Sequence, residues 1–164
     1  MARVRARPVR GMLLPMPSAS ATSQIKDSLF KLVTGLHRQV FLTSKGRIAG
    51  SAMGMPVVML TTKGRRSGKM RHNMLTSPLE MGDSFVLVAS FGGDDRHPAW
   101  FLNLRQNPDV EVSMRGKTRR ARARIAAGDE RAELWSKLTA AHSNYAGYQT
   151  KTTREIPVVV IDPA

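Results

Sequence analysis

Cysteine is absent from this chain of 164 residues, and aromatic residues make up only 5% of it. Without a thiol there is no disulfide, no thiolate nucleophile and no zinc site of the cysteine type. No apolar run approaches the roughly 20 residues that a membrane-spanning helix needs, so we expect no such helix. The 4 histidines are scattered, without the spacing or the carboxylate neighbours of a metal site, and we expect no metal.

Acidic residues are also scarce, since 12 Asp and Glu stand against 26 Lys and Arg and leave a formal net charge of +14. This balance indicates an anionic partner, which could be nucleic acid, an acidic membrane surface or a polyanionic small molecule. Charge alone does not choose among these three. The cytoplasm is the favoured compartment, with the inner face of the membrane as an alternative location.

The chain divides by composition into a tail and one domain. Residues 1–24 are rich in Arg, Pro, Ser and Ala, which predicts a disordered basic tail. Residues 25–164 are long enough for one domain with a core. This domain is expected to begin with an amphipathic helix over about 25–40, whose polar face is basic. Docking of that helix on the core is favoured over binding at a membrane surface.

A basic loop between two apolar runs is the strongest functional signal. The segment TTKGRRSGKMR, residues 61–71, predicts a hairpin whose glycines, Gly64 and Gly68, let backbone N–H groups approach a ligand. Its cations suit phosphate or carboxylate oxygens, although a solvated turn is the alternative. The loop is not a Walker motif, because only three residues separate its glycines. The cations are Lys63, Arg65, Arg66, Lys69 and Arg71.

The rest of the chain predicts a mainly β fold. Five or six short strands interrupted by two helices favour an antiparallel barrel with helical covers over a parallel sheet. The strand at 118–126 places three arginines on one face and Ala121, Ala123 and Ile125 on the other. A later helix is expected to bury one stripe of side chains. The arginines are Arg120, Arg122 and Arg124, and the stripe is Leu134, Trp135, Leu138 and Ala141.

Two further segments are candidates for a site. In SFGGDDRHPAWFLNL, backbone donors at Ser90, Gly92 and Gly93 precede a helix that begins near Pro98, an arrangement suited to an anion or a ring carbonyl. On that helix Trp100 is expected in the core, and Asn103 is either solvated or a ring contact.

The only two tyrosines, Tyr145 and Tyr148, stand three residues apart in a polar segment. They either face a shared cleft or pack against the barrel. A phenol can donate a proton to a substrate oxygen, so the pair suits a reductase.

Three ordered motifs, LTTKGRRSGKMRHNML, VASFGGDDRHPAWFLNLRQNPDV and YAGYQTKTTREIPVVVI, resemble the deazaflavin-dependent nitroreductase and quinone reductase family of actinobacteria. The resemblance covers about residues 46–163. It implies a split β-barrel of the flavin-reductase or FMN-binding type that binds coenzyme F420, an 8-hydroxy-5-deazaflavin whose tail carries a phosphate, lactate and several glutamates.

The resemblance also implies roles for single residues. The arginines Arg65, Arg66 and Arg71 match the family's tail-binding cations, with Lys63 and Lys69 as helpers. The loop of Ser90, Gly92 and Gly93 lies beside the deazaflavin ring, and Trp100 and Asn103 lie on the helix that lines the ring pocket. Tyr145 and Tyr148 match the acceptor-site tyrosines, of which Tyr148 is the expected proton donor or orienting group. Two positions depart from the family pattern, Met74 for proline and Phe91 for a lysine of some members.

These observations predict an oxidoreductase that transfers a hydride from reduced coenzyme F420 to a quinone, a nitro compound or another activated small-molecule acceptor. An FMN-dependent oxidoreductase on the same barrel is one alternative. A non-catalytic, basic protein that binds nucleic acid through Arg120, Arg122, Arg124 and the Arg-rich tail is another, and a cofactor carrier without turnover is a third. The physiological acceptor and the oligomeric state are left open.

Overall fold

The computed structural model describes residues 51–52 and 54–164. The expected basic tail and the expected amphipathic helix therefore lie outside the described residues. No helix in the described part is long and apolar enough to cross a membrane. In chain order the elements are β1 (Ser51–Ala52), β2 (Met55–Lys63), β3 (Met70–Thr76), β4 (Leu79–Met81), β5 (Ser84–Val88), the 3-10 turn η1 (Phe91–Gly93), α2 (Ala99–Gln106), β6 (Asp109–Met114), β7 (Lys117–Ile125), α3 (Gly128–Ala141), α4 (Asn144–Gln149) and β8 (Val158–Pro163).

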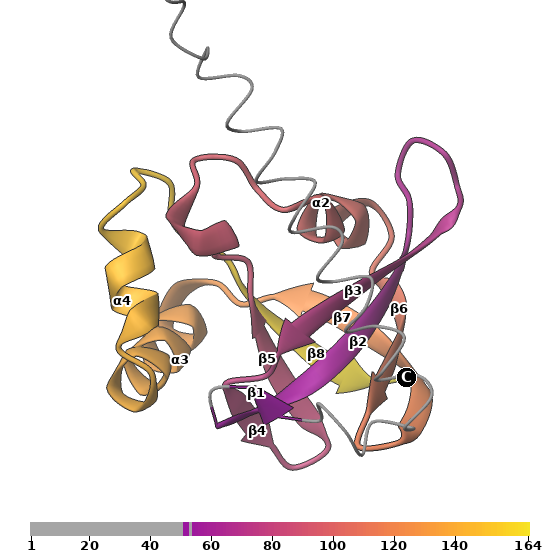
Figure 1. The fold of residues 1–164 in the computed structure, drawn as a ribbon, viewed down its shortest axis with the longest axis horizontal. Coiled ribbons are helices and arrows are strands. Elements are labelled where there is room, and N and C mark those ends of the chain that lie inside the picture. The colour runs from indigo at the N-terminus through magenta and orange to yellow at the C-terminus, as the bar shows by residue number, and fades with distance from the viewer. Residues whose placement is uncertain (1–50, 53) are drawn as a thin grey trace, which may run out of the picture. The chain divides into compact units, whose positions relative to one another are not determined.

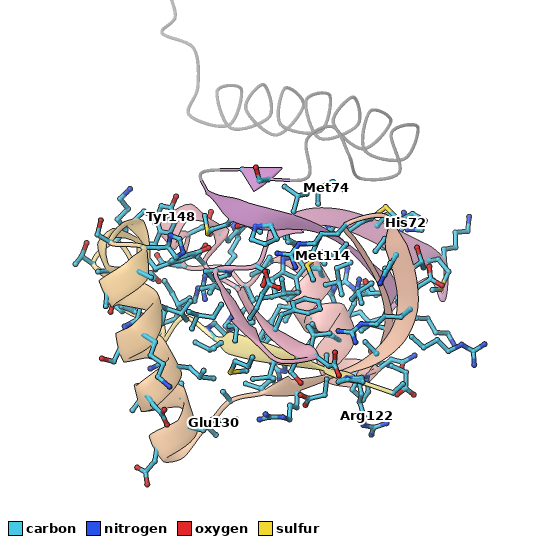
Figure 2. The ribbon with its side chains drawn as sticks, turned by 90° about the horizontal axis from the view of Figure 1, so that it is seen from below. His72, Met74, Met114, Arg122, Glu130 and Tyr148 are labelled. Carbon is cyan, nitrogen blue, oxygen red and sulfur yellow. The ribbon has the colours of Figure 1, made fainter. Side chains whose placement is uncertain are left out.

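The strands form one antiparallel sheet that curls around a core (Figures 1 and 2). Its path runs β1-β2-β6-β7-β8-β5-β4, and β3 pairs with β2 off this path. Strand β2 is thus the hub, since it pairs with β1, β3 and β6. Because β2 continues beyond its pairing with β6, its end and the start of β3 project as a hairpin (Figure 1).

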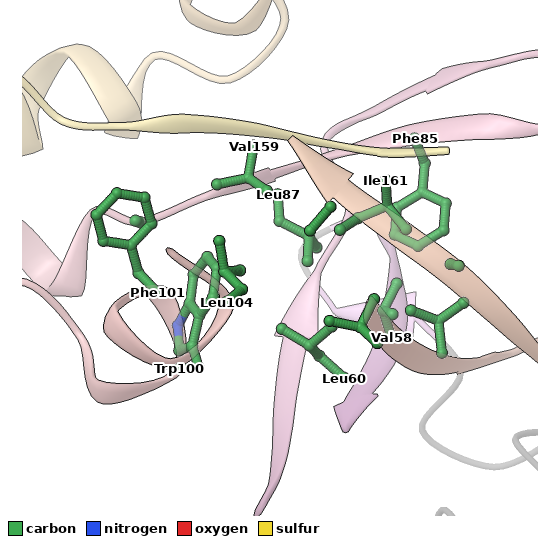
Figure 3. Close-up of a cluster of buried hydrophobic side chains, with 14 residues drawn as sticks. Val58, Leu60, Phe85, Leu87, Trp100, Phe101, Leu104, Val159 and Ile161 are labelled. Carbon is green, nitrogen blue, oxygen red and sulfur yellow. The ribbon is translucent and has the colours of Figure 1, made fainter. Parts of the chain in front are cut away.

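The main core lies between the inner face of the sheet and helix α2 (Figure 3). Side chains from β2, β5 and β8 meet Trp100, Phe101 and Leu104 of α2, and all of them are buried. Burial of a side chain of this size contributes about 1.5–3 kcal/mol relative to exposure. This packing fixes α2 across the barrel, so the helix can hold the residues on its outer side in fixed positions. The strand residues labelled in Figure 3 are Val58, Leu60, Phe85, Leu87, Val159 and Ile161.

A second cluster lies on the other face of β8, under helix α3. Successive side chains of a strand point to opposite faces, so Val158 and Val160 pack with Leu134 and Leu138. The expected stripe of α3 is right for these two leucines. It is wrong for Ala141, which is exposed at the end of the helix.

The expected class, a mainly β barrel with helices, is confirmed, but the expected number of strands is wrong because the described residues form eight. The missed strands β1 and β4 have two and three residues, too few to show a period of two. The short helix α4 was also missed, since its sequence NYAGYQ contains a glycine and no apolar stripe.

Candidate functional site

The hairpin between β2 and β3 is closed by its own backbone. Lys63 pairs with Met70 in the strand register, and the Gly64 N–H donates to the Lys69 carbonyl at 2.8 Å. The Gly68 N–H donates to the Gly64 carbonyl, also at 2.8 Å. The predicted hairpin is confirmed, and Gly68 has a φ of 67°, a conformation that costs glycine little, whereas Gly64 has no positive φ.

Asn103 of α2 anchors this loop to the body of the protein. Its side-chain oxygen accepts from the Arg65 backbone N–H at 3.2 Å and from the Arg65 guanidinium Nη1 at 3.4 Å. Its Nδ2 donates to Thr62 Oγ1 at 3.2 Å. The amide is 5% exposed, and each of its polar atoms has a partner. Asn103 is therefore not solvated, and its polar atoms position Arg65 and β2.

Three of the loop cations, Arg65, Arg66 and Arg71, line a cleft of about 500 Å³. Within the part of the chain that the structure describes, none of the five cations forms an ion pair. Like charges this close repel one another unless an anion or solvent screens them. The cleft is therefore a ready site for a polyanion. Its lining is Gly64, Arg65, Arg66, Ser67, Met70, Arg71, His72, Asn73, Ala99 and Asn103.

His72 lines this cleft and was not singled out from the sequence. Its Nδ1 lies 2.9 Å from Thr61 Oγ1, which fixes the orientation of the ring. A lone histidine in a strand gives no sequence signal of this kind, because the hydroxyl that orients it stands on the neighbouring strand β2.

The arginines of β7 present the opposite situation. Arg122 Nη1 lies 2.9 Å from Asp109 Oδ1, and Arg124 lies 2.6 Å from Glu130 and 2.8 Å from Asp162. Hydrogen bonds that Arg124 donates, first to Glu130 and then to Asp162, raise its pKa. Figure 2 shows Arg122 and Glu130 on the edge away from His72 and Tyr148.

The expected two faces of this strand are confirmed except at its last residue. Ala121 and Ala123 are buried and the three arginines are exposed, but Ile125 is 44% exposed. Most of the predicted basic stripe is thus neutralised, which removes much of the case for a nucleic-acid surface.

The second candidate segment is a tight turn before α2. Ser90 is half-buried and directly precedes η1, whose three residues have positive φ values, 50° at Phe91, 67° at Gly92 and 87° at Gly93. Phe91 is 44% exposed, and its ring lies 5.6 Å from the Arg96 guanidinium. A left-handed backbone at a phenylalanine is strained and persists only where surrounding contacts hold it.

The two tyrosines lie together on α4 but in different environments. Their rings meet edge to face, with centroids 6.0 Å apart and planes at 82°. Tyr145 is buried, its hydroxyl lies 3.8 Å from Met55 Sδ, and burial raises its pKa. Tyr148 is half-buried, and Lys151 Nζ lies 5.6 Å from its ring centroid. Of the pair, Tyr148 is the one that a bound molecule can reach.

Trp100 lies in the hydrophobic core with 5% of its surface exposed, as its apolar character predicted. Its indole meets the Phe101 ring edge to face at 6.2 Å. Met74, one of the departures from the family pattern, is half-buried against Val57 and Met59 of β2.

The structure gathers the predicted residues into two groups. Arg65, Arg66, Arg71 and Asn103 line the cleft, whereas Ser90, Gly92, Gly93 and the tyrosines lie along the η1 and α4 side. Helix α2 stands between the projecting hairpin and η1 in Figure 1. A ligand that contacts both groups must therefore extend past the N-terminal end of α2. No group of His, Asp or Glu in the described residues could hold a metal ion.

Comparison with known proteins decides the family. The model of the F420H(2)-dependent quinone reductase family matches residues 34–163. The chain belongs to this family. The activity that defines F420H2-dependent quinone reductases is the transfer of a hydride from reduced coenzyme F420 to a quinone.

Individual relatives agree with this assignment. An F420H(2)-dependent quinone reductase of Mycobacterium tuberculosis is 37% identical over 130 residues, which cover 77% of this chain and 87% of the relative. A solved F420-H2 dependent reductase, FDR-A, is 42% identical with a TM-score of 0.59, covering 65% of this chain and 94% of its own. A solved domain-swapped dimer is 32% identical at the same TM-score of 0.59, covering 87% and 99%. The split β-barrel expected from the resemblance is thus confirmed.

Proposed function

We propose that this protein binds reduced coenzyme F420 and reduces a quinone with it, using the hairpin cleft for the anionic tail of the coenzyme. The observation that carries the proposal is a hairpin with five cations, none of which forms an ion pair within the described residues, and three of which, Arg65, Arg66 and Arg71, line the cleft. The tail of F420 supplies the phosphate and carboxylates that such a group lacks. Arg forks match these oxygens bidentately, and Lys63 and Lys69 add point charges.

We place the deazaflavin ring beside η1. A ring next to Ser90 and Gly92 would have its tail toward the hairpin, because α2 begins between the two groups. We assign Asn103 and Trp100 indirect roles, since the first holds Arg65 and the second fixes α2 in the core. The bound 5-deazaflavin supplies the chemistry, because it passes a hydride readily and is a poor carrier of single electrons.

The protein's own task is to hold donor and acceptor together and to exclude water. We assign the acceptor contact to Tyr148, whose hydroxyl can orient the quinone or donate a proton to its oxygen. Burial raises the pKa of the Tyr145 hydroxyl, so this residue stays neutral. Its ring packs edge to face against the Tyr148 ring and supports it.

The alternatives lose support on specific observations. The family assignment favours F420 over FMN. The nucleic-acid alternative rests on the tail, which lies outside the described residues, and on the β7 stripe, in which Arg122 and Arg124 already have carboxylate partners. A cofactor carrier would bind F420 as the proposed enzyme does but would not reduce a quinone, so a turnover assay must distinguish the two.

The test is to add F420 and FMN separately to the purified protein and to follow the fluorescence of each. The F420H2 complex is then mixed with a soluble quinone while the return of oxidised F420 is recorded. We expect saturable F420 binding and quinone-dependent oxidation. Tight FMN binding without F420 binding would contradict the cofactor assignment, and F420 binding without turnover would leave a carrier.

Tyr148→Phe tests the assigned acceptor contact. The substitution should leave F420 affinity unchanged and lower quinone turnover about 10 to 100-fold, since the lost hydroxyl acts mainly in the transition state. Tyr145→Phe is the matched control and should change turnover less, because its hydroxyl contacts Met55 instead of solvent. Unchanged turnover in Tyr148→Phe would show that the hydroxyl does not act on the acceptor and that Tyr148 serves only in packing.

A further inference from the structure

The segment that follows α4 holds the η1 turn through one side chain, Arg154. Its guanidinium donates from Nη2 to the carbonyls of Ala89 and Ser90, at 3.1 and 2.8 Å, and from Nε to the carbonyl of Asp94 at 2.9 Å. Nη1 lies 3.3 Å from His97 Nδ1. One arginine therefore grips both ends of the turn, from more than 50 residues away in sequence.

The imidazole contact fixes the state of His97. A guanidinium has only donors, so His97 Nδ1 must accept and the ring proton of the neutral form lies on Nε2. Burial, with Arg154 and Arg105 nearby, lowers the pKa of His97 and keeps the ring neutral. Arg154 forms no ion pair with any carboxylate in residues 51–52 and 54–164, so its hydrogen bonds serve the turn.

The same segment is tied to the tyrosine helix. Gln149 of α4 donates from Nε2 to the Arg154 carbonyl at 2.8 Å and accepts from the Ile156 N–H at 3.0 Å. Thr152 Oγ1 donates to Asp95 Oδ1 at 2.7 Å, which adds a second tie to the turn. A continuous set of hydrogen bonds thus runs from α4 to η1.

Close backbone packing joins the two elements as well. A Cβ on Gly93 would lie 2.8 Å from both the Tyr148 carbonyl and Lys151 Cβ. Only glycine permits this approach, and its φ of 87° also favours glycine. The turn that carries the proposed ring contacts therefore rests directly on the helix that carries Tyr148.

We infer that Arg154 is a positioning residue, which holds the strained η1 turn against α4 so that the ring site and Tyr148 keep a fixed relation. Three consecutive positive φ values, one at Phe91, need support from outside the turn. Arg154 gives that support at the carbonyls that flank them. The inference rests on the proposed function for its effect on coenzyme binding, but not for its effect on the turn itself.

The experiment compares Arg154→Gln with Arg131→Gln. Arg131 of α3 is a matched control because it also holds this segment, through the Ile156 carbonyl and Glu155, but it does not contact the turn. Amide hydrogen exchange is measured without coenzyme at Gly93 and Asp94, whose N–H groups bond to the Ser90 and Phe91 carbonyls. F420 affinity is measured by fluorescence, and a thermal melt is recorded for each variant.

Arg154→Gln should speed exchange at these two amides at least about tenfold and weaken F420 binding about 10 to 100-fold. Arg131→Gln should lower the melting temperature without either change. Arg154→Lys keeps the charge but loses the planar fork, so it should give intermediate values, and it replaces the glutamine variant if that variant does not fold.

Unchanged exchange in the Arg154 variants, or equal opening of the turn in Arg131→Gln, would overturn the inference. Fast exchange with unchanged F420 affinity would also overturn it, since the turn would then not hold the coenzyme. If the unaltered protein does not bind F420, the proposed function fails, and the exchange data still decide whether Arg154 holds the turn.

Discussion

The β2–β3 hairpin and strand β7 are both rich in arginine, yet most of the arginines of β7 have carboxylate neighbours and those of the hairpin do not. Strand β7 lies between β6 and β8, and the register places Asp109 and Asp162 beside Arg122 and Glu111 beside Arg120. The hairpin projects beyond β6, and the strand opposite it begins Met70-Arg71-His72, without an acid. A similar richness in cations therefore gives a largely neutralised surface at β7 and a cleft with unpaired cations at the hairpin.

The difference shows that an anion site is marked by the absence of neighbouring carboxylates more than by the number of cations. A paired arginine on a surface contributes about 0–1 kcal/mol to stability and has little attraction left for a ligand. Unpaired cations held on a rigid hairpin keep their attraction, at a cost in mutual repulsion that a bound anion relieves. The site is thus prepared for its ligand by the absence of acids.

The largest expected effect comes from removing charge from each region in turn. The double variant Arg65→Ala, Arg66→Ala should weaken F420 binding by about 1–3 kcal/mol for each charged hydrogen bond lost. The matched variant Arg120→Ala, Arg122→Ala should change it by less than about 0.5 kcal/mol. Fluorescence titrations at low and high salt measure both, and salt should weaken F420 binding more in the unaltered protein than in the hairpin variant. Equal losses in the two variants would end the distinction between the regions.

A smaller effect is expected from the anchor of the hairpin. Asn103→Ala removes the bonds to Arg65 and Thr62 without changing a charge, so F420 affinity should fall about tenfold. Asn107→Ala is the control at the end of the same helix, where the side chain accepts only from the Asp109 N–H at 3.3 Å. Coenzyme titration of both variants checks this, and equal affinities would show that the loop keeps its shape without Asn103.

The smallest effect concerns the paired region under acid. Hydrogen bonding from Ser84, followed by Arg124, lowers the pKa of Asp162 in the folded protein. Its contribution is therefore complete above the unfolded pKa of about 3.9 and is lost as pH falls through the lower folded value. Asp162→Asn should flatten the decline of the melting temperature below about pH 4. The effect on the free energy of unfolding should be less than about 1 kcal/mol, because the Arg124–Asp162 pair is exposed. A steeper decline in the variant would contradict the sign of the shift.

The sequence was sufficient for the hairpin because glycines and cations between two apolar runs are local signals. The strands around Val58, Leu87 and Val159 were likewise predictable from short apolar runs. The pairing of the β7 arginines was not, because their carboxylates come from β6, α3 and β8. Sequence spacing gives no distance between such residues.

Two features of the candidate site were missed for the same reason. Arg154 looks like any solvated arginine in a polar segment, and its partners are backbone carbonyls of a turn about 60 residues earlier. Asn103 was recognised as a site residue, but its role in holding Arg65 depends on where α2 packs. Long-range hydrogen bonds of this kind appear only once the fold has brought the elements together.

The most direct test of the hairpin assignment is a thermodynamic cycle between loop and tail. F420 and its tail-free deazaflavin are each titrated into the unaltered protein and into Arg65→Ala, Arg66→Ala. If the hairpin binds the tail, removing the tail should weaken binding strongly in the unaltered protein and much less in the double variant, giving a coupling energy above about 1 kcal/mol. Additive losses, with a coupling energy near zero, would show that the tail lies elsewhere and would contradict the account.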